Sequence, residues 1–389
     1  MNTLQTPYFL IDKEELDKNI VELKQALIEG WGNYTIGYSF KTNSLPWIIN
    51  HLKQHGCFAE VVSSDEYNLA LHMGYDPTKI IFNGPVKEKQ EFDEAVLKGA
   101  IVNIDSRREI DWLRMLDDSS LVNIGIRVNV DLKNIPDETD YFDEGSRFGF
   151  CPVNGDLYQI VAELESLGNV KIQGLHLHLG SRTRGLKVYK ELARLACEIK
   201  RKTSIKFSYV DVGGGFFGGL PTKPSFKEYV ETIATELRQE FSPDETALIM
   251  EPGAAIIASP ISFVTSVVDV RNTNKSTIVT LDGSRINIDP LMTKDNYFYN
   301  IDSASDDIIK KQIIVGFTCM EKDRIITIYD KPGLQIGDKI TFEKVGSYTM
   351  ALNPLFIQYY PSVYVNVRKG HKLVRERWNV EDYVQKQSW

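Results

Sequence analysis

The sequence predicts an α/β fold in which a (β/α)8 barrel of the TIM type is followed by an all-β domain. Up to Met250, eight apolar strand-like runs alternate with segments of helical periodicity. Eight strands spread over about 220 residues are typical of a barrel rather than of a doubly wound open sheet. After Met250 the pattern changes to short β-type runs separated by Gly, Pro, Asn and Asp turns, without a convincing long helix.

The first elements are a strand over Thr6–Asp12 and a helix to about Leu27, with Asp12 and Glu15 spaced as in a capping box. Barrel strands are then expected at Tyr34–Phe40, Phe58–Val62, Lys79–Phe82, Ala100–Ile104, Leu121–Val128, Val170–Leu177, Ser208–Val212 and Leu248–Met250. Helices are expected between them at Leu45–His55, Ser64–Met73, Lys87–Lys98, Ser106–Leu116, Val153–Leu167, Leu186–Lys202 and Phe226–Phe241.

The β-type runs after the barrel are Pro260–Asp269, Ser276–Leu281, Gln312–Val315, Arg324–Ile328, Asp338–Lys344 and Val363–Val367. We therefore expect three parts of the chain: an N-terminal segment (1–30) whose first strand joins the β-domain, a barrel (31–255) and a C-terminal β-domain (256–389). In such barrels the catalytic groups lie at the C-terminal ends of the strands, so the residues that follow each strand are the candidates for chemistry.

The composition is that of a globular protein, with 42% hydrophobic and 25% charged residues among 389. The net charge of −8 argues against a nucleic-acid partner, because binding to a phosphate backbone needs a basic face. The four cysteines are scattered, which favours neither disulfides nor a zinc site. The sequence shows no secretory leader and no apolar run of membrane length, so we expect a cytoplasmic protein without a membrane partner.

Lys41 falls at the end of the first barrel strand, within Tyr38-Ser39-Phe40-Lys41-Thr42-Asn43. A lysine at the end of a core strand is unusual, because burial of an ammonium is costly and favours the neutral, nucleophilic amine. Such an amine suits a Schiff base. The structural alternative is a lysine whose ammonium reaches solvent. The residues at the other strand ends favour the chemical role.

Three other strand ends complement an amine. Three glycines in Asp211-Val212-Gly213-Gly214-Gly215-Phe216 follow the seventh strand, where barrels commonly bind phosphate, and Ser181 adds a hydroxyl after the sixth. His178 can stack on an aromatic ring, and Glu251 can hold a proton on a heterocyclic nitrogen. Each group also has a plainer interpretation. The three glycines would form a flexible turn, His176 and His178 would bind a metal, and Glu251 would form a salt bridge. A third ligand with suitable spacing is missing, so no metal is expected.

A lysine for an imine, a glycine nest for a phosphate, an imidazole that stacks and a carboxylate for a pyridinium together indicate pyridoxal 5′-phosphate. From about Thr6 to about Tyr359 the chain resembles the fold-type III pyridoxal-phosphate decarboxylases, the family of ornithine, arginine and diaminopimelate decarboxylases. The resemblance rests on residues 38–43, 60–66, 81–87, 127–129, 147–149, 176–181, 211–216, 251–253, 316–319 and 346–349. It implies an alanine racemase-like barrel with a β-domain, and a head-to-tail homodimer whose active sites form between subunits.

Carried onto this sequence, the resemblance implies that Lys41 forms the Schiff base, His178 stacks on the cofactor ring and Glu251 pairs with the pyridine nitrogen. Cys319, in the β-domain, would reach the partner subunit's site as a proton donor; the alternative is a buried small hydrophobe. The residues expected to contact the cofactor are Lys41, Glu60, Arg127, His178, Ser181, Gly214, Gly215, Glu251, Gly253 and Tyr348.

The implied activity is that of a carboxy-lyase, which decarboxylates an amino acid at Cα and releases an amine and CO2. Glu251 argues against the first alternative, an amino-acid racemase on the same fold, because the resembling alanine racemases place an arginine at the ring nitrogen. The second alternative is a catalytically silent pyridoxal-phosphate-binding regulator, since the family also includes antizyme inhibitors. The presence of Lys41 and Cys319 argues against it.

Three positions depart from the family pattern. Ala254 stands where members usually have an arginine that pairs with the phosphate, and we expect Arg182 or Arg184 to replace that charge. Met320 stands where ornithine and diaminopimelate decarboxylases have an acidic residue for the distal ammonium. Asp289 stands where diaminopimelate enzymes carry an arginine for the distal carboxylate.

These changes disfavour diaminopimelate, ornithine or lysine bound in the usual way, because a buried ammonium without a carboxylate partner is costly. We expect an amino acid that is diaminopimelate-like or has a modified, conjugated or carrier-bound distal end. Glu321 or Asp323 is an alternative source of a carboxylate. The acidic loop Asp131–Glu144 either lines the entrance or is a solvated surface loop.

Overall fold

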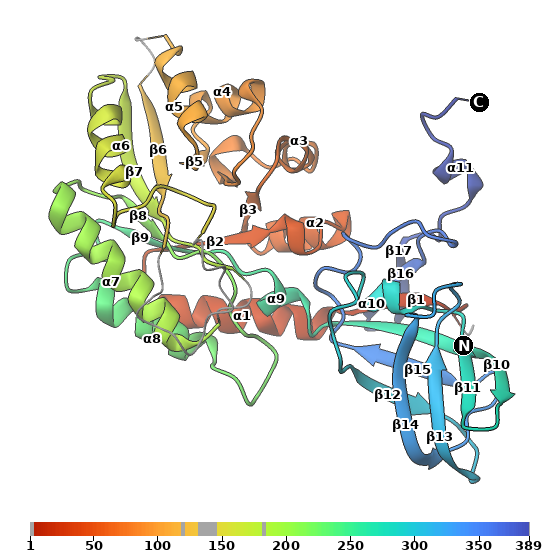
Figure 1. The fold of residues 1–389 in the computed structure, drawn as a ribbon. Coiled ribbons are helices and arrows are strands. Elements are labelled where there is room, and N and C mark those ends of the chain that lie inside the picture. Colours follow the sequence, from red (N-terminus) through yellow and green to blue (C-terminus); the bar gives the residue numbers. More distant parts are fainter. Residues whose placement is uncertain (1–3, 118–120, 131–145, 181–183, 389) are drawn as a thin grey trace. The chain divides into compact units, whose positions relative to one another are not determined.

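The computed structural model describes residues 4–117, 121–130, 146–180 and 184–388. The chain divides into two compact units (Figure 1). One unit, Asn19–Ile256, contains the barrel, and the other combines Met1–Lys18 with Ile257–Trp389. Helix α1 (Lys13–Gly30) begins in one unit and ends in the other.

The barrel unit contains eight parallel strands that close in the order β2 to β9, which confirms the predicted fold class. Closure occurs between β2 and β9, where Tyr34 pairs with Leu248 and Ile36 with Met250. The strands are β2 (Tyr34–Ser39), β3 (Phe58–Val61), β4 (Ile80–Phe82), β5 (Ile101–Ile104), β6 (Val122–Arg127), β7 (Val170–His176), β8 (Tyr209–Asp211) and β9 (Ala247–Met250). Each overlaps a run that the apolar pattern predicts.

The helices between the strands cover the outside of the barrel (Figure 1). Local sequence fixes where several begin: Ser106 with Glu109 and Ser225 with Glu228 form capping boxes at the starts of α5 and α8. The helices are α2 (Pro46–Gln54), α3 (Ser64–His72), α4 (Lys89–Leu97), α5 (Arg107–Arg114), α6 (Asp156–Glu165), α7 (Leu186–Thr203), α8 (Phe226–Leu237) and the short α9 (Ala254–Ile257), with 3-10 turns η1 (Phe40–Thr42) and η2 (Pro77–Lys79).

Tyr209 of β8 fills part of the barrel interior. Its ring belongs to a buried cluster with Ile81 of β4 and Ile249 of β9. Gly125 and Gly174 make room for it, because a Cβ at either position would stand 2.1 or 2.0 Å from Tyr209 atoms. The aromatic ring therefore occupies space that two neighbouring strands leave open, and its hydroxyl can reach the polar groups described below.

The second unit is a nine-stranded sheet in the order β14-β13-β11-β10-β1-β16-β17, with β15 paired to both β10 and β12. β1 runs antiparallel to β10 and parallel to β16. The strands are β1 (Tyr8–Asp12), β10 (Ile261–Asn272), β11 (Thr277–Leu281), β12 (Phe298–Asp302), β13 (Ile308–Val315), β14 (Arg324–Pro332), β15 (Lys339–Glu343), β16 (Ser362–Val367) and β17 (Gly370–Arg375), with short helices α10 (Arg285–Ile288) and α11 (Val380–Tyr383).

The apolar pattern does not predict β12 and β17. Neither strand has a fully buried residue, so neither carries the alternation that marks a strand with one face in the core. Both are held by backbone pairing, β12 with β15 and β17 with β16.

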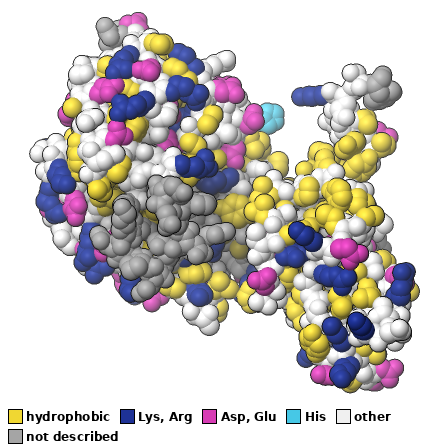
Figure 2. Space-filling view, viewed as in Figure 1, with side chains coloured by type: hydrophobic (Ala, Val, Ile, Leu, Met, Phe, Trp, Pro, Cys, Tyr) yellow, Lys and Arg dark blue, Asp and Glu magenta, His cyan; other side chains and the backbone are white. Residues whose placement is uncertain are grey.

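Charged side chains of both signs are interspersed over the visible face of the barrel unit (Figure 2). Some form surface ion pairs between helices, such as Arg107 with Asp156 and Arg114 with Glu163. Within the described ranges, no helix is both long enough and apolar enough to cross a bilayer.

Candidate active site

Lys41 lies in the turn η1, directly after β2. Tyr38 and Phe40 are fully buried on either side of Ser39, and the Tyr38 hydroxyl donates a hydrogen bond to the Asn43 carbonyl oxygen over 2.8 Å. These contacts fix the turn. The Lys41 side chain stays 37% exposed, so its backbone is held while its amine remains accessible.

Two neighbouring strand ends pack against this turn. Lys41 Nζ lies 3.2 Å from Glu60 Oε2 on β3, and the Glu60 side chain is almost completely buried. Gly253, after β9, is so close to Thr42 that a Cβ would stand 2.1 Å from the threonine Oγ1. A larger residue at position 253 would displace the lysine turn, which gives Gly253 a packing role beside its expected contact with the cofactor.

Glu251 follows β9 and is the centre of a buried acidic group. A carboxylate oxygen of Glu251, one of Asp211 and a ring nitrogen of His176 all lie within 4.8 Å of one another. Burial, together with the charge of Glu251, raises the pKa of Asp211 well above its ordinary value. Burial opposes ionisation of Glu251 as well, but the neighbouring His176, whose Nε2 lies 3.4 Å from Glu251 Oε2, and a hydrogen bond from Asp211 lower the pKa of Glu251. Glu251 is therefore the ionised carboxylate and Asp211 the protonated one.

His178 is held as a neutral imidazole. Burial and the positive charges of Lys41 and Arg127 lower its pKa well below the ordinary value. Its Nδ1 accepts a hydrogen bond from the Gly214 N–H over 3.2 Å, so the proton of the neutral ring is on Nε2. The His176 and His178 rings are parallel to within 3°, with their centroids 6.2 Å apart.

The glycine run after β8 is required by the packing of the protein on itself. The Gly213 N–H donates to Asp211 Oδ1 over 2.8 Å. A Cβ at Gly214 would stand 2.2 Å from the Glu251 carbonyl oxygen, and Gly215, at φ +93°, would bring a Cβ to 3.0 Å from the Gly180 carbonyl oxygen. The sequence suggests glycines that leave their amides to a ligand, but the amides of Gly213 and Gly214 already have protein acceptors.

Arg127 ends β6 beside the same group of strand ends. Its Nη1 lies 2.8 Å from Asp105 Oδ2, and Asp105 Oδ1 accepts the Gly149 N–H. The guanidinium lies over the Phe148 ring, 4.3 Å from its centroid. Arg127 Nε is buried and has no hydrogen-bond partner among the described residues, so a donor is left for a bound group.

The sequence argument includes Asn83 among the strand-end residues without giving it a role, and it does not name Asn103. Asn83 follows β4, and its side-chain nitrogen lies 2.6 Å from Glu251 Oε1 and 3.1 Å from Glu60 Oε1. Asn103 is within β5 and donates to Asn83 Oδ1. Two features of the sequence could have pointed to them. Asn103 is a polar residue in an otherwise apolar run, and Asn83 directly follows a predicted strand.

Four of the β-domain candidates, Cys319, Met320, Glu321 and Asp323, lie on the loop between β13 and β14. Cys319 is exposed and Met320 is half-buried. Buried Asp323 organises this loop: its Oδ2 accepts hydrogen bonds from the Ser284 hydroxyl and from both the hydroxyl and the N–H of Thr318. Its Oδ1 accepts the Arg285 N–H. Asp323 is thus committed to fixing the loop that carries Cys319.

Asp289 is engaged in a similar way. It is buried, its Oδ2 lies 3.1 Å from Arg285 Nη2 and 2.9 Å from the Tyr297 hydroxyl, and Oδ1 accepts the Thr293 N–H. Glu321 differs, because its side chain is 93% exposed and pairs only loosely, at 3.2 Å, with Arg324.

Tyr348 belongs to the β-domain and is half-buried in the left-handed backbone region, at φ +55°. Ser181, Arg182 and the acidic loop Asp131–Glu144 lie outside the described residues. Arg184 is described: its guanidinium lies over the Phe217 ring, 5.2 Å from the centroid, in the loop that follows the glycine run.

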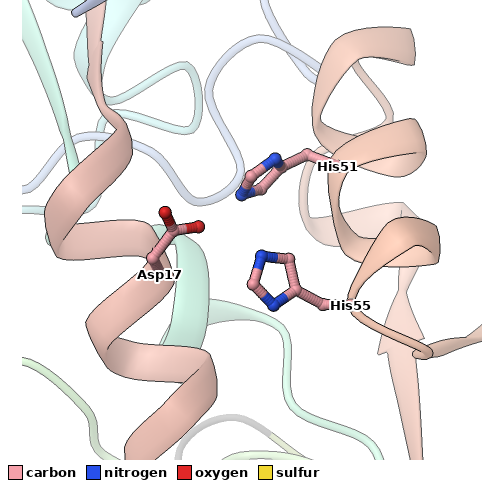
Figure 3. Close-up of side chains that lie close together, drawn as sticks. All are labelled: Asp17, His51 and His55. Carbon is pink, nitrogen blue, oxygen red and sulfur yellow. The ribbon is translucent and has the colours of Figure 1, made fainter. Parts of the chain in front are cut away.

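Histidines occur at a second place in the barrel unit, at the end of α2. The rings of His51 and His55 lie side by side, with centroids 4.8 Å apart (Figure 3). Figure 3 also labels Asp17 on α1. Asp17 belongs to the other unit, so we assign no site to these three residues. Since the group around Glu251 also has the chemistry of metal ligands, the expectation of no metal remains a prediction.

Comparison with known proteins decides the family. Residues 14–258 match the family described as pyridoxal-dependent decarboxylase, pyridoxal binding domain. The chain belongs to this family. Its cofactor is therefore pyridoxal 5′-phosphate, and its reaction is the decarboxylation of an amino acid, as the motifs around Lys41 and Glu251 predict.

Two relatives and one solved structure show how far the similarity of this decarboxylase extends. A probable chloroplastic diaminopimelate decarboxylase of Oryza sativa subsp. japonica is 29% identical over 90% of this chain and 72% of its own length. The diaminopimelate decarboxylase of Aquifex aeolicus is 26% identical over 98% and 91%. The crystal structure of the diaminopimelate decarboxylase of Methanocaldococcus jannaschii has the same fold, with a TM-score of 0.86 and 22% identity over 99% of this chain and 93% of that one.

The residues of this decarboxylase fit the cofactor. The accessible amine of Lys41, held at a fixed turn, suits the cofactor aldehyde. The ionised, buried carboxylate of Glu251 suits a protonated ring nitrogen of the cofactor. Among the described residues, the buried Arg127 Nε without a hydrogen-bond partner leaves a polar donor beside these strand ends. These groups come from β2, β6 and β9, all at the C-terminal face of the barrel.

Proposed function

We propose that this decarboxylase acts on a diaminopimelate-like amino acid whose distal end is modified, conjugated or bound to a carrier. The observation that carries this proposal is that both buried carboxylates expected near the distal end, Asp289 and Asp323, are occupied by hydrogen bonds within the β-domain. Met320 stands at the position where a family carboxylate is expected. A substrate with a free distal ammonium would therefore lack a buried partner.

Within the barrel each side chain has a separate task. Bound pyridoxal phosphate supplies the electron sink for the electrons of the broken Cα–carboxylate bond. Lys41 Nζ binds the cofactor aldehyde, and Glu60 Oε2, 3.2 Å from Nζ, accepts and returns the proton of that amine. Neutral His178 presents a ring face for stacking, and ionised Glu251 keeps a proton on the ring nitrogen. Retention of that proton is what favours decarboxylation.

For the phosphate we assign Ser181 and Gly215, and Tyr348 as the family resemblance implies, whereas Gly214 shapes the turn because its N–H already donates to His178 Nδ1. Because Ala254 offers no charge, we assign the missing cation to Arg184. The position of its guanidinium over Phe217, two residues after Gly215, supports this assignment. The Tyr229 hydroxyl donates a hydrogen bond to the Arg184 carbonyl oxygen, which fixes the backbone of Arg184.

We also propose a homodimer in which Cys319 of one subunit serves the site of the other. Cys319 is exposed on a loop that Asp323 fixes through four hydrogen bonds, as required of a group that must be presented to a neighbouring chain. Its Sγ would deliver a proton to Cα of the product after CO2 has left.

The test is CO2 release from the purified holoenzyme with meso-diaminopimelate, L-lysine, L-ornithine and the same amino acids acylated at the distal nitrogen. We expect the acylated compounds to be preferred. The Met320→Glu variant should shift the preference toward a free distal ammonium, whereas Met115→Glu, which adds the same charge at an exposed site of the barrel unit, should not. Turnover of meso-diaminopimelate by the wild type at a kcat/KM of about 10⁴ M⁻¹s⁻¹ or more would remove the proposal.

A further inference from the structure

A chain of side-chain hydrogen bonds crosses the barrel interior and ends at two carboxylates. The Tyr209 hydroxyl donates to Asn103 Oδ1 over 2.8 Å. Asn103 Nδ2 donates to Asn83 Oδ1, also over 2.8 Å. Asn83 Nδ2 then donates to Glu60 Oε1 over 3.1 Å and to Glu251 Oε1 over 2.6 Å. Residues of β8, β5, β3 and of the segments after β4 and β9 are joined in this way.

The direction of this chain is fixed by its end. Ionised carboxylates only accept hydrogen bonds, so the side of the Asn83 amide that faces Glu60 and Glu251 must be its NH2 group. The Asn83 oxygen then faces Asn103 and requires the NH2 group there, which leaves the Asn103 oxygen for the Tyr209 O–H. Every donor therefore points toward the carboxylates, and the neutral Asn83 amide, which has two N–H groups, directs one to each of them.

The surroundings make these bonds strong. Glu60, Asn83 and Asn103 are each at most 2% exposed, and Glu251 is 4% exposed. Hydrogen bonds to charged groups in such a medium are stronger than those between neutral groups. Gly125 is required here as well, since a Cβ would stand 2.0 Å from Asn103 Oδ1. The barrel thus gives up side-chain volume to accommodate the polar chain.

We propose that Asn83 is a positioning residue for the decarboxylation: by donating one N–H to each carboxylate it keeps Glu251 anionic toward the cofactor ring nitrogen while Glu60 stays paired with Lys41. Asn103 and Tyr209 orient the Asn83 amide. The inference rests on the pairing of Glu251 with the ring nitrogen proposed above. Without the Asn83 donor, Glu251 becomes a stronger base, and the proton shared with the ring nitrogen moves toward the carboxylate.

The experiment compares binding of two ligands by the apoenzyme: pyridoxal 5′-phosphate and its 1-deaza analogue, in which a C–H replaces the ring nitrogen. The readout is the ratio of the two dissociation constants, which does not depend on catalytic activity. For the wild type we expect a preference for pyridoxal phosphate of about 10-fold or more, because a charge-assisted hydrogen bond is lost with the analogue. Asn83→Asp, which removes both donors at nearly constant volume, should reduce the preference to less than about 3-fold.

Two further variants separate positioning from a general structural role. Tyr209→Phe removes only the remote hydroxyl, so the preference for pyridoxal phosphate should fall by a smaller factor than in Asn83→Asp. This variant also provides the test if the Asn83 variant does not fold. Thr246→Val is the matched control: it loses one buried hydrogen bond, to the Phe207 carbonyl oxygen, before the start of β9, and should leave the preference unchanged.

The outcomes distinguish the two claims. A wild type that binds both ligands equally contradicts the pairing of Glu251 with the ring nitrogen. A wild-type preference that Asn83→Asp and Tyr209→Phe retain in full contradicts the positioning role of Asn83, as does an equal loss of affinity for both ligands. A preference that falls in both variants and not in Thr246→Val supports it.

Discussion

Lys41 Nζ and Glu60 Oε2 lie 3.2 Å apart at the ends of the adjacent strands β2 and β3. Glu60 is buried and Lys41 is not, so the carboxylate is fixed and the amine is the mobile partner. The same carboxylate accepts the Asn83 N–H through its other oxygen, which links the lysine to Glu251 by two side chains.

Glu60→Gln tests this relationship. The amide keeps an oxygen for Asn83 but loses the negative charge opposite Lys41, so proton return at Nζ should slow and kcat should fall by about 10-fold or more. Steady-state kinetics with the best substrate of the panel measure the change. Glu88→Gln, at an exposed position before α4, is the control and should behave as the wild type. An unchanged kcat in Glu60→Gln would show that Glu60 has no part in the proton transfer.

Arg184→Ala should weaken cofactor binding. If Arg184 supplies the phosphate charge that Ala254 does not, its loss should raise the dissociation constant of pyridoxal phosphate by about 10-fold, whereas affinity for pyridoxal, which lacks the phosphate, should not change. Equilibrium titration of the apoenzyme measures both. Arg201→Ala removes a cation from the exposed face of α7 and serves as the control. Equal affinities of wild type and Arg184→Ala for the phosphate would exclude this role.

Lys87→Met should destabilise the barrel strongly. Lys87 and Glu109 form an ion pair in which both side chains are at most 1% exposed, and Lys87 also donates to the Gly84 and Asn103 carbonyl oxygens. Breaking it leaves an unpaired buried carboxylate, at a cost of about 3–5 kcal/mol. Thermal denaturation should show this loss, while Lys98→Met, which breaks the exposed pair with Glu94, should cost less than about 0.5 kcal/mol. Similar losses in the two variants would refute this assignment.

Glu66 should make stability pH-dependent. Burial raises its pKa from 4.5 to about 7 in the folded protein, although its Oε2 accepts the Val62 N–H. Between these two values the folded state holds a proton that the unfolded state releases, so its contribution to stability is present below pH 4.5 and is lost as the pH rises through about 7. Glu66→Gln removes this loss.

The variant should therefore be more stable than the wild type by about 2 kcal/mol near pH 8 and by much less near pH 5. Melting temperatures at the two pH values measure the difference. Asp65→Asn, at an exposed neighbour on α3, should show no such gain. A Glu66→Gln stabilisation of the same size at both pH values would contradict the shifted pKa.

The sequence was sufficient for the barrel and for the placement of Lys41 and Glu251 at its strand ends, because both depend on local pattern. Lys41 and Glu251 stand directly after apolar runs, where parallel strands place their chemistry. The Asn83–Asn103–Tyr209 chain was not predictable, since it depends on which residues of non-adjacent strands face one another inside a closed barrel. The structural engagement of Asp323 was not predictable either, because its partner Ser284 lies 39 residues away in sequence.

The central claim is that Glu251 keeps the ring nitrogen protonated and thereby directs decarboxylation. It is tested most directly by CO2 release from Glu251→Gln loaded with pyridoxal phosphate, compared with the wild type under single-turnover conditions. We expect the variant to retain the absorbance band near about 420 nm that reports binding to Lys41, and to release CO2 on the order of 10²–10³-fold more slowly. CO2 release at the wild-type rate from Glu251→Gln with that band intact would contradict the account.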